Sequence, residues 1–227
     1  MTTSPAVASG QRAPTALPER DQIALLPPFE GLDLPDIHVV DSAERAAMAL
    51  SSLMQAGAVG FDTESKPTFA KNEVSQGPHL LQFATHDAAW LFQLHRSEFH
   101  DVLATLLAAP ELVKAGFGLS SDLKLIRERF GIEPRAVVDI DHEFRRQGYR
   151  KSVGVKTAVA LMFGRRLAKS RKATTSNWAS RQLTPAQLRY AANDAYAAIC
   201  LYSALGLGSP REPALRTTAP GPTGWAA

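Results

Sequence analysis

Short apolar runs that alternate with helical stretches constrain the fold of this chain more than any other feature. Helices are expected from a Ser42 N-cap, over residues 97–108, from a Ser cap at 120 to Gly131, and over most of residues 140–205. Apolar runs of strand length occupy residues 37–40, 58–62, 80–85, 88–94, 112–118 and 136–140. Strands and helices in this order predict an α/β fold, a mixed central sheet with helices packed on its faces.

The two ends of the chain differ in composition from this alternating part. Six of the fifteen prolines precede Ile37 and four follow Leu207, in stretches that are also rich in Ala, Thr and Gly. Such composition buries little apolar surface. We therefore expect a flexible N-terminal arm over residues 1–35, one compact domain over residues 36–207, and a flexible tail over residues 208–227.

Several classes of protein are disfavoured by simple features. No apolar run approaches the ~20 residues that a membrane-spanning helix needs, and the N-terminus lacks the apolar stretch of a secretory signal. The single cysteine, Cys200, excludes an internal disulfide framework and a cysteine-rich zinc site. These features predict a cytoplasmic protein without a membrane partner, and they leave its oligomeric state open.

Two carboxylates stand together at the end of an apolar strand. In the sequence FDTES, Asp62 and Glu64 are two residues apart, so in an extended chain their side chains project to the same side. The two negative charges repel each other unless a cation binds between them, and carboxylate oxygens suit Mg²⁺ or Mn²⁺. The alternative is a surface Asp and Glu that are hydrated or ion-paired, and Asp-x-Glu is common enough by chance that the pair alone favours this alternative.

Two further acidic residues lie on predicted helices. Asp122 is in the first turn of one helix, where the helix dipole alone would favour it. Asp194 lies four residues after Tyr190 on the helix that starts at Thr184-Pro185, so the two side chains share a face. Because that helix is mostly apolar, Asp194 needs a partner. A metal ion, a buried Arg or a hydrogen-bonded Tyr would each serve.

A basic segment suggests a polyanionic partner. Twelve Lys or Arg and no Asp or Glu occur between Arg145 and Arg189. Clustered cations neutralise phosphates and release their counterions, as nucleic-acid binding requires. A solvated basic face on a protein of pI near 9.1 is the alternative.

These pieces, in this order, resemble the DEDD superfamily of 3′→5′ exonucleases, in the subclass with tyrosine in the third motif. FDTE matches the first motif, GFGLSSDLKLI the second, and YAAND within SNWASRQLTPAQLRYAANDAYAAICLY the third. The match is strongest to Werner-type exonuclease domains, with ribonuclease D more distant, and it covers roughly residues 37–206. The resemblance implies a ribonuclease H-like fold with a mixed sheet of about five strands flanked by helices.

The resemblance also implies a mechanism. Two divalent metal ions, Mg²⁺ or Mn²⁺, would clamp the scissile phosphate, and nucleoside 5′-monophosphates would leave one at a time from the 3′ end. Tyr190 would orient the attacking water, since a phenol is too weak an acid to be a ready base at neutral pH. The metal-binding residues implied are Asp62, Glu64, Asp122 and Asp194.

The substrate-binding residues implied by similarity are less specific. They are the main-chain groups at Thr63, the cations Lys169, Arg171 and Lys172, and Trp178, for which packing is the alternative to stacking on a base. No aromatic wedge is evident beside Asp122, which favours single-stranded or frayed 3′ ends.

Other functions stay open at this point. One is a catalytically weak or inactive nucleic-acid-binding or interaction module of the same fold, and another is a phosphodiesterase that acts on something other than nucleic acid. The choice between DNA and RNA is also open, because a main-chain group can contact the 2′-hydroxyl.

Overall fold

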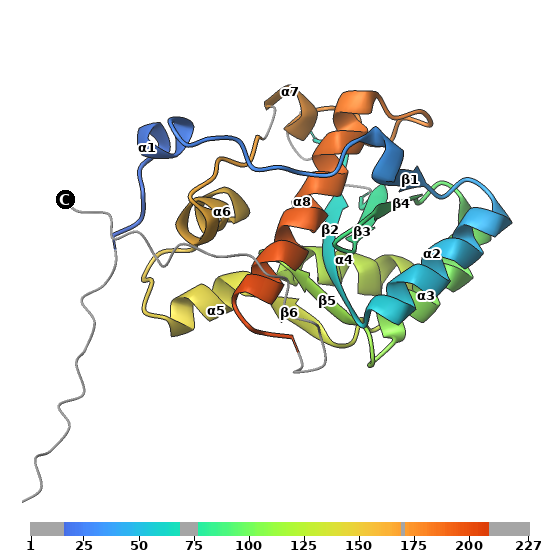
Figure 1. Ribbon diagram of the computed structural model, residues 1–227. Helices are drawn as coiled ribbons and strands as arrows, with labels where there is room; N and C mark the ends of the chain where they lie inside the picture. The colour runs from blue at the N-terminus through green and yellow to red at the C-terminus, as the bar shows by residue number, and fades with distance from the viewer. Residues whose placement is uncertain (1–15, 69–76, 169–170, 209–227) are drawn as a thin grey trace, which may run out of the picture.

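The computed structural model describes residues 16–68, 77–168 and 171–208. Within these residues, six strands form one sheet in the order β1-β4-β3-β2-β5-β6 (Figure 1). The strands β2, β3 and β4 pair antiparallel, and the other neighbours pair parallel. The strands are β1 Ile37–Val39, β2 Ala58–Glu64, β3 Leu80–Ala84, β4 Ala89–Gln93, β5 Val113–Gly116 and β6 Val137–Asp139. The predicted mixed α/β sheet is confirmed, with six strands where the resemblance implied about five.

The helix signals in the sequence are mostly confirmed. The Ser42 hydroxyl accepts from the Arg45 amide at 3.2 Å, and Thr184 caps the last helix with Pro185 in its first turn. The predicted Ser cap at residue 120 is wrong by one position, because Leu119 is the N-cap and Ser120 is already helical. The helices are α1 Arg20–Ala24, η1 Leu34–Asp36, α2 Ala43–Ala56, η2 Ser97–Phe99, α3 His100–Ala108, α4 Ser120–Phe130, α5 Ile140–Arg146, α6 Val155–Phe163, α7 Arg171–Thr174 and α8 Pro185–Ala204.

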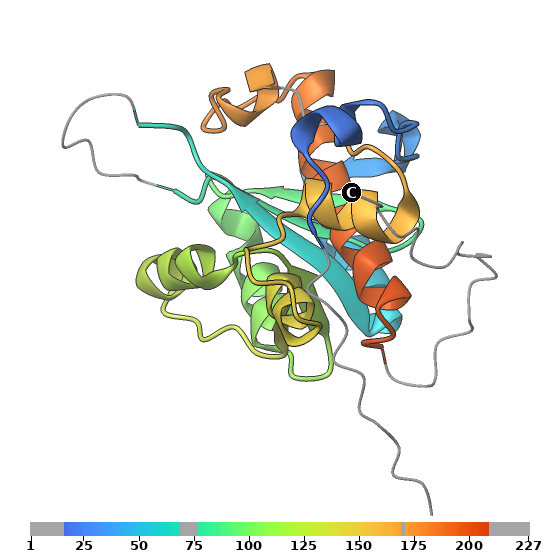
Figure 2. The same ribbon diagram turned by 90° about the vertical axis from the view of Figure 1, so that its left-hand side faces the viewer.

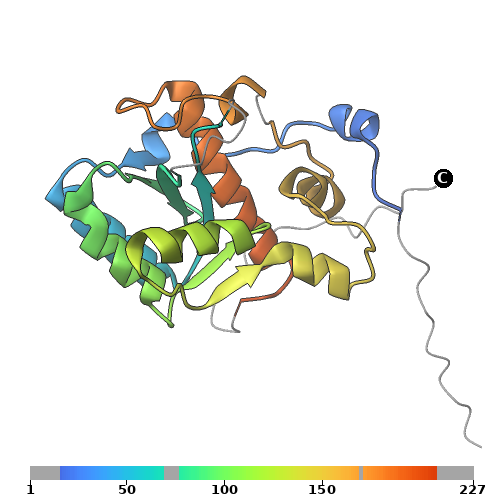
Figure 3. The ribbon, with the colours of Figure 1, turned by 180° about the vertical axis from the view of Figure 1, so that it is seen from behind.

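Helices cover both faces of the sheet. Helices α2, α3 and α4 lie on one face, which is nearest the viewer in Figure 3, and they bury an aromatic row made of Phe61, Phe83 and Phe92. Helix α8 crosses the other face, with α5 and α6 packed beside it (Figure 1). None of the described helices is long and apolar enough to cross a membrane.

Helix α8 lies directly against β2 because β2 carries glycine at the crossing point. A Cβ at Gly60 would lie 1.7 Å from the carbonyl oxygen of Ala195 and 3.0 Å from the amide nitrogen of Ile199. The buried alanines of α8 add little side-chain bulk on the side that faces the sheet. The last helix among the described residues is therefore held over the strand that carries the FDTE sequence (Figure 1 and Figure 2).

Part of the expected N-terminal arm packs on the domain. The ring of Phe29 contacts Phe163 at 5.7 Å, and the Asn193 side chain on α8 bonds both backbone groups of Leu32. Asp33 pairs with Arg189 at 2.7 Å. The division of the chain at residues 35 and 207 stays a prediction, but residues 29–33 contact the domain although they precede its expected start.

Candidate active site

Asp62 and Glu64 lie on the face of β2 that α8 covers. The strand runs through Glu64, two residues further than the sequence indicated. Side chains alternate along a strand, so Gly60, Asp62 and Glu64 share one face, and Gly60 is the residue that touches α8. The prediction that the two carboxylates project together is confirmed. They point toward the helix that carries the third motif.

Helix α8 brings Tyr190 and Asp194 to the same region. Its first half packs over β3 and β4, where Tyr190 and Ala191 contact the cluster that contains Leu80 and Leu91. Its second half crosses β2 at Ala195. Asp194, which is 5% exposed, lies next to that crossing. A carboxylate this deeply buried requires a compensating partner, as the sequence indicated.

The Tyr190 side chain is held by contacts with α7 and with Trp178. It accepts a hydrogen bond from the Thr174 hydroxyl of α7 at 3.1 Å, and its ring lies 5.8 Å from that of Trp178. Trp178 is 1% exposed, so it packs behind Tyr190 and does not present a face to a base. The packing role, which the sequence left as the alternative, fits the structure.

Asp122 reaches the end of β2 from the opposite side. Its carboxylate accepts a hydrogen bond from the Thr63 hydroxyl at 2.5 Å, and Thr63 points away from the α8 face. Burial raises the pKa of Asp122, and the Thr63 hydrogen bond offsets part of this rise. Asp139 fixes the turn before α4 by accepting from the backbone amides of Gly118 and Leu119. The second motif therefore meets the strand end beside the first.

The carboxylates suit a hard divalent cation, although they do not form a finished cage. No three His, Cys, Asp or Glu side chains in the part of the chain that the structure describes are gathered closely enough to hold a metal ion. Mg²⁺ usually keeps several waters and takes one or two carboxylates together with substrate phosphates, so a complete protein cage is not required. The all-oxygen donors of Asp62, Glu64 and Asp194 fit such an ion.

The predicted substrate-binding cations are only partly described. Lys169 lies outside the described residues, and Arg171 begins α7 without a described side chain. Lys172 is exposed. Some cations of the basic segment are paired within the protein: Arg145 binds Asp141 at 3.1 Å. Contacts of these residues with phosphate stay a prediction.

A fully buried glutamine lies beside the carboxylates, and sequence reasoning missed it. Gln82 pairs in register with Asp62 across β3 and β2, so the two side chains share the α8 face. It is 0% exposed, and neither atom of its amide has a hydrogen-bond partner among the described residues. The signal was a polar residue within LLQFA, an otherwise apolar strand.

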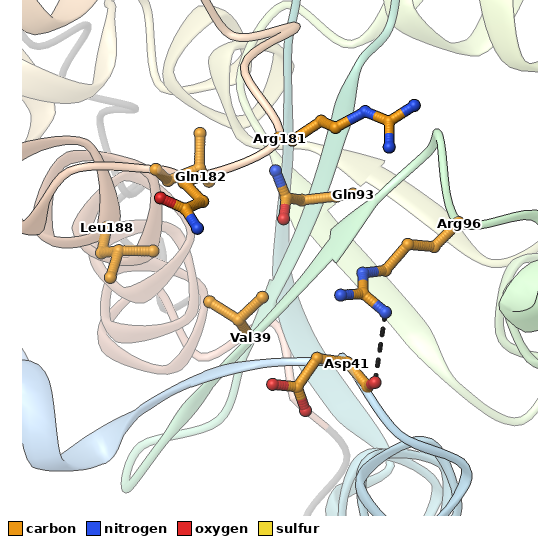
Figure 4. A pocket seen from close by; sticks show the side chains of 8 residues that line it. Val39, Asp41, Gln93, Arg96, Arg181, Gln182 and Leu188 are labelled. Atoms are coloured by element: carbon orange, nitrogen blue, oxygen red, sulfur yellow. Dashed lines mark hydrogen bonds between the residues drawn. The ribbon is translucent and has the colours of Figure 1, made fainter.

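Sequence reasoning also missed a pocket at the outer corner of the same face. It has a volume of about 340 Å³ and lies between the end of β4, the end of β1 and the start of α8 (Figure 4). Two arginines and two glutamines give it a polar, cationic side. Its lining residues are Val39, Asp41, Gln93, Arg96, Arg181, Gln182, Leu183 and Leu188.

Comparison with known sequences finds related proteins. A model of the 3'-5' exonuclease family matches residues 37–207. The chain is similar to an exonuclease mut-7 homolog of Aedes aegypti, with 31% identity over 199 residues that cover 77% of this chain and 27% of that protein. The chain thus spans about a quarter of the length of that relative.

Solved structures show the same fold. The Aedes aegypti Nibbler EXO domain superposes with a TM-score of 0.65 at 26% identity, covering 79% of this chain and 92% of that structure. Trypanosoma brucei RNase D in complex with RNA U12 superposes with a TM-score of 0.66 at 22% identity, covering 85% of this chain and 66% of that structure. These similarities confirm the expected ribonuclease H-like fold.

Proposed function

This chain belongs to the 3'-5' exonuclease family, and we propose that it hydrolyses phosphodiester bonds at the 3′ ends of nucleic acid and releases nucleoside 5′-monophosphates. One observation carries the proposal: α8 lies on the face of the sheet from which Asp62 and Glu64 project, with Tyr190 over β3 and β4 and the buried Asp194 next to the crossing of β2. This arrangement supports a site in which acidic oxygens and one phenol on the same face of the sheet receive a 3′ terminus.

We propose that two divalent ions, Mg²⁺ or Mn²⁺, bind at these carboxylates. When bound, such ions activate a water and stabilise the leaving 3′ oxygen. Asp62, Glu64 and Asp194 would hold them from the α8 face. Asp122 would reach them from the α4 side, where Thr63 fixes its carboxylate at 2.5 Å. The Tyr190 hydroxyl, which Thr174 orients, would donate to the scissile phosphate or position the attacking water.

Nucleic acid is the proposed partner, and the polymer is left open. The similar Trypanosoma brucei RNase D was solved with RNA U12, and the family match does not separate RNA from DNA. Single-stranded or frayed 3′ ends are the proposed form, since the sequence offers no aromatic wedge beside Asp122 to separate a terminal base pair. A cytoplasmic location is likewise a proposal.

The test uses matched DNA and RNA strands with a 5′ label. Each is offered single- and double-stranded, with Mg²⁺, with Mn²⁺ or with EDTA. We expect stepwise shortening from the 3′ end and mononucleotide release with either metal, and neither in EDTA. Strand binding without any mononucleotide release would instead indicate a binding module that has lost catalysis.

Replacing Tyr190 with Phe should lower kcat about 10- to 100-fold with little change in metal affinity, because the ring still packs on Trp178 while the hydroxyl is lost. Single-turnover cleavage and Mn²⁺ titration measure the two effects. The matched control is Tyr149→Phe, since Tyr149 packs on Phe144 away from the carboxylates. Equal rates for Tyr190→Phe and the wild type would remove Tyr190 from the mechanism.

A further inference from the structure

The corner pocket and the carboxylates lie on the same face of the sheet, at the same end. Across the sheet, Glu64 pairs with Leu80, and Leu80 pairs with Gln93. Side chains that pair across strands point to the same face, so Gln93 in the pocket and Glu64 in the site share the α8 face. Two strand spacings separate them, which is ~10 Å.

The pocket carries a surplus of positive charge. The Asp41 carboxylate is paired with Arg45 at 3.0 Å, and Glu98 lies 3.5 Å from Arg96. Arg181 takes part in none of the ion pairs found among the described residues. One uncompensated guanidinium, that of Arg181, therefore belongs to the residues that line the pocket, at its rim (Figure 4).

Neighbouring groups are consistent with this positive charge, and they fix the hydrogen-bond donors of the pocket. Burial, together with the nearby Arg181 and Arg96 charges, lowers the pKa of His95. Arg96 Nη1 donates to the Asp41 carbonyl oxygen at 3.2 Å, which is the dashed line in Figure 4, while its buried Nε has no partner among the described residues. Gln93 Nε2 donates to the Ser180 carbonyl oxygen at 2.9 Å and so fastens the loop that carries Arg181.

We propose that this pocket is a phosphate subsite for the nucleic-acid strand whose 3′ end enters the carboxylate site. The inference rests on the proposed function. A guanidinium group can bind two phosphate oxygens in a bidentate geometry, and the Arg181 guanidinium is available to bind a phosphate in this way. A stacked strand carries one phosphate for about every 3.4 Å, so ~10 Å corresponds to a phosphate two to four nucleotides from the 3′ end.

The test measures binding without cleavage, so that it stands apart from catalysis. A fluorescent single strand long enough to reach the pocket and a dinucleotide too short to reach it are titrated with protein in EDTA. Arg181→Ala should raise the Kd of the long strand about 5- to 10-fold and reduce its salt slope by ~0.7. It should leave the Kd of the dinucleotide unchanged.

A charge-matched control and a positional scan sharpen the result. Arg135→Ala removes an exposed arginine just before β6, at the opposite end of the sheet, and should leave both affinities unchanged. Neutral methylphosphonate linkages are then introduced one at a time. One linkage near the 3′ end should weaken the wild type but not Arg181→Ala. The proposal would be overturned if Arg181→Ala weakened the binding of both strand lengths equally, or if no single neutral linkage weakened binding by the wild type alone. Both results are independent of cleavage.

A second inference rests on the unpartnered amide of Gln82. Burying an amide without a hydrogen bond is costly, so the presence of this residue calls for a partner or a compensating role. Its cross-strand neighbour is Asp62, whose Oδ1 accepts from the Thr63 amide at 2.8 Å. Directly paired residues on one face of a sheet have Cβ atoms ~5 Å apart, so the Gln82 amide is long enough to reach the Asp62 carboxylate.

We infer that Gln82 is a positioning residue for Asp62. In the loaded site, Gln82 Nε2 would donate to one oxygen of the Asp62 carboxylate and leave the other for the cation. This inference also rests on the proposed function. A purely structural glutamine would have its partners already, as Gln187 has: its Nε2 donates to Ser176 Oγ at 3.0 Å and to the Asn177 carbonyl oxygen at 3.3 Å.

Gln82→Met separates stability from function. Met fills a similar volume without a buried amide, so Tm in EDTA should rise by ~2–6 °C. The Kd for Mn²⁺ should rise, and kcat should fall about 10-fold or more. Gln187→Met is the matched control and should lower Tm, because it leaves bonded groups without partners. A lower Tm for Gln82→Met, or unchanged Mn²⁺ affinity, would overturn the inference even if the protein has no nuclease activity.

Discussion

Replacing Asp194 with Asn should lower kcat by at least about 10³-fold while the protein stays folded. The change removes one negative oxygen and keeps the volume of the side chain. Asp194 is 5% exposed, so its charge acts in a poorly hydrated region, where it attracts a cation more strongly than in water. A loss of 10³-fold is equivalent to ~4 kcal/mol of transition-state stabilisation, a reasonable share for one ligand of a catalytic ion.

The stability of this variant distinguishes a ligand from a structural acid. Added Mn²⁺ should stabilise the wild type more than the variant, because an ion that binds only the native state raises its stability. Asp101→Asn, an exposed acid in the first turn of α3, is the control. Near-normal turnover by Asp194→Asn would contradict the metal-ligand assignment.

The parts of the fold that follow from local pattern were predictable from the sequence. Alternation along FDTE placed Asp62 and Glu64 on one face, and the spacing of Tyr190 and Asp194 placed them one helical turn apart. Both rules depend only on backbone geometry, so they hold wherever the strand and helix form. The Thr184 cap is equally local, and the structure shows it accepting from Gln187.

The parts that depend on register or on distant contacts were not predictable. The pairing of Gln82 with Asp62 depends on how β3 aligns with β2, and nothing within LLQFA encodes that alignment. The hydrogen bond between Asp122 and Thr63 could be predicted only if it were known that α4 lies on the opposite face of the sheet from α8. The docking of Leu32 on Asn193 joins segments that lie far apart in the chain. A single sequence shows the chemistry of such residues but not their neighbours.

The packing of α8 on β2 depends on one glycine. Gly→Ala within a strand would normally stabilise a protein by roughly 0.5–1 kcal/mol, since glycine loses more backbone freedom on folding. At Gly60 the sign should reverse. The added Cβ would lie 1.7 Å from the Ala195 carbonyl oxygen and 2.7 Å from its carbon. These are backbone atoms in the middle of a helix, so no side-chain rotation can relieve the contact.

Gly60→Ala should therefore destabilise the protein by about 3 kcal/mol or more, the range of severe overpacking. The midpoint of urea unfolding at constant slope measures this. Gly154→Ala is the control: no heavy atom lies within 4 Å of its added Cβ, and its loss should stay within about 1 kcal/mol for a changed N-cap. Because α8 carries Tyr190 and Asp194, the kcat of the folded Gly60→Ala molecules should also fall as the helix moves away from β2. If the variant were as stable and as active as the wild type, the helix would have shifted without moving the carboxylates. The close approach at Gly60 would then not determine the geometry of the site.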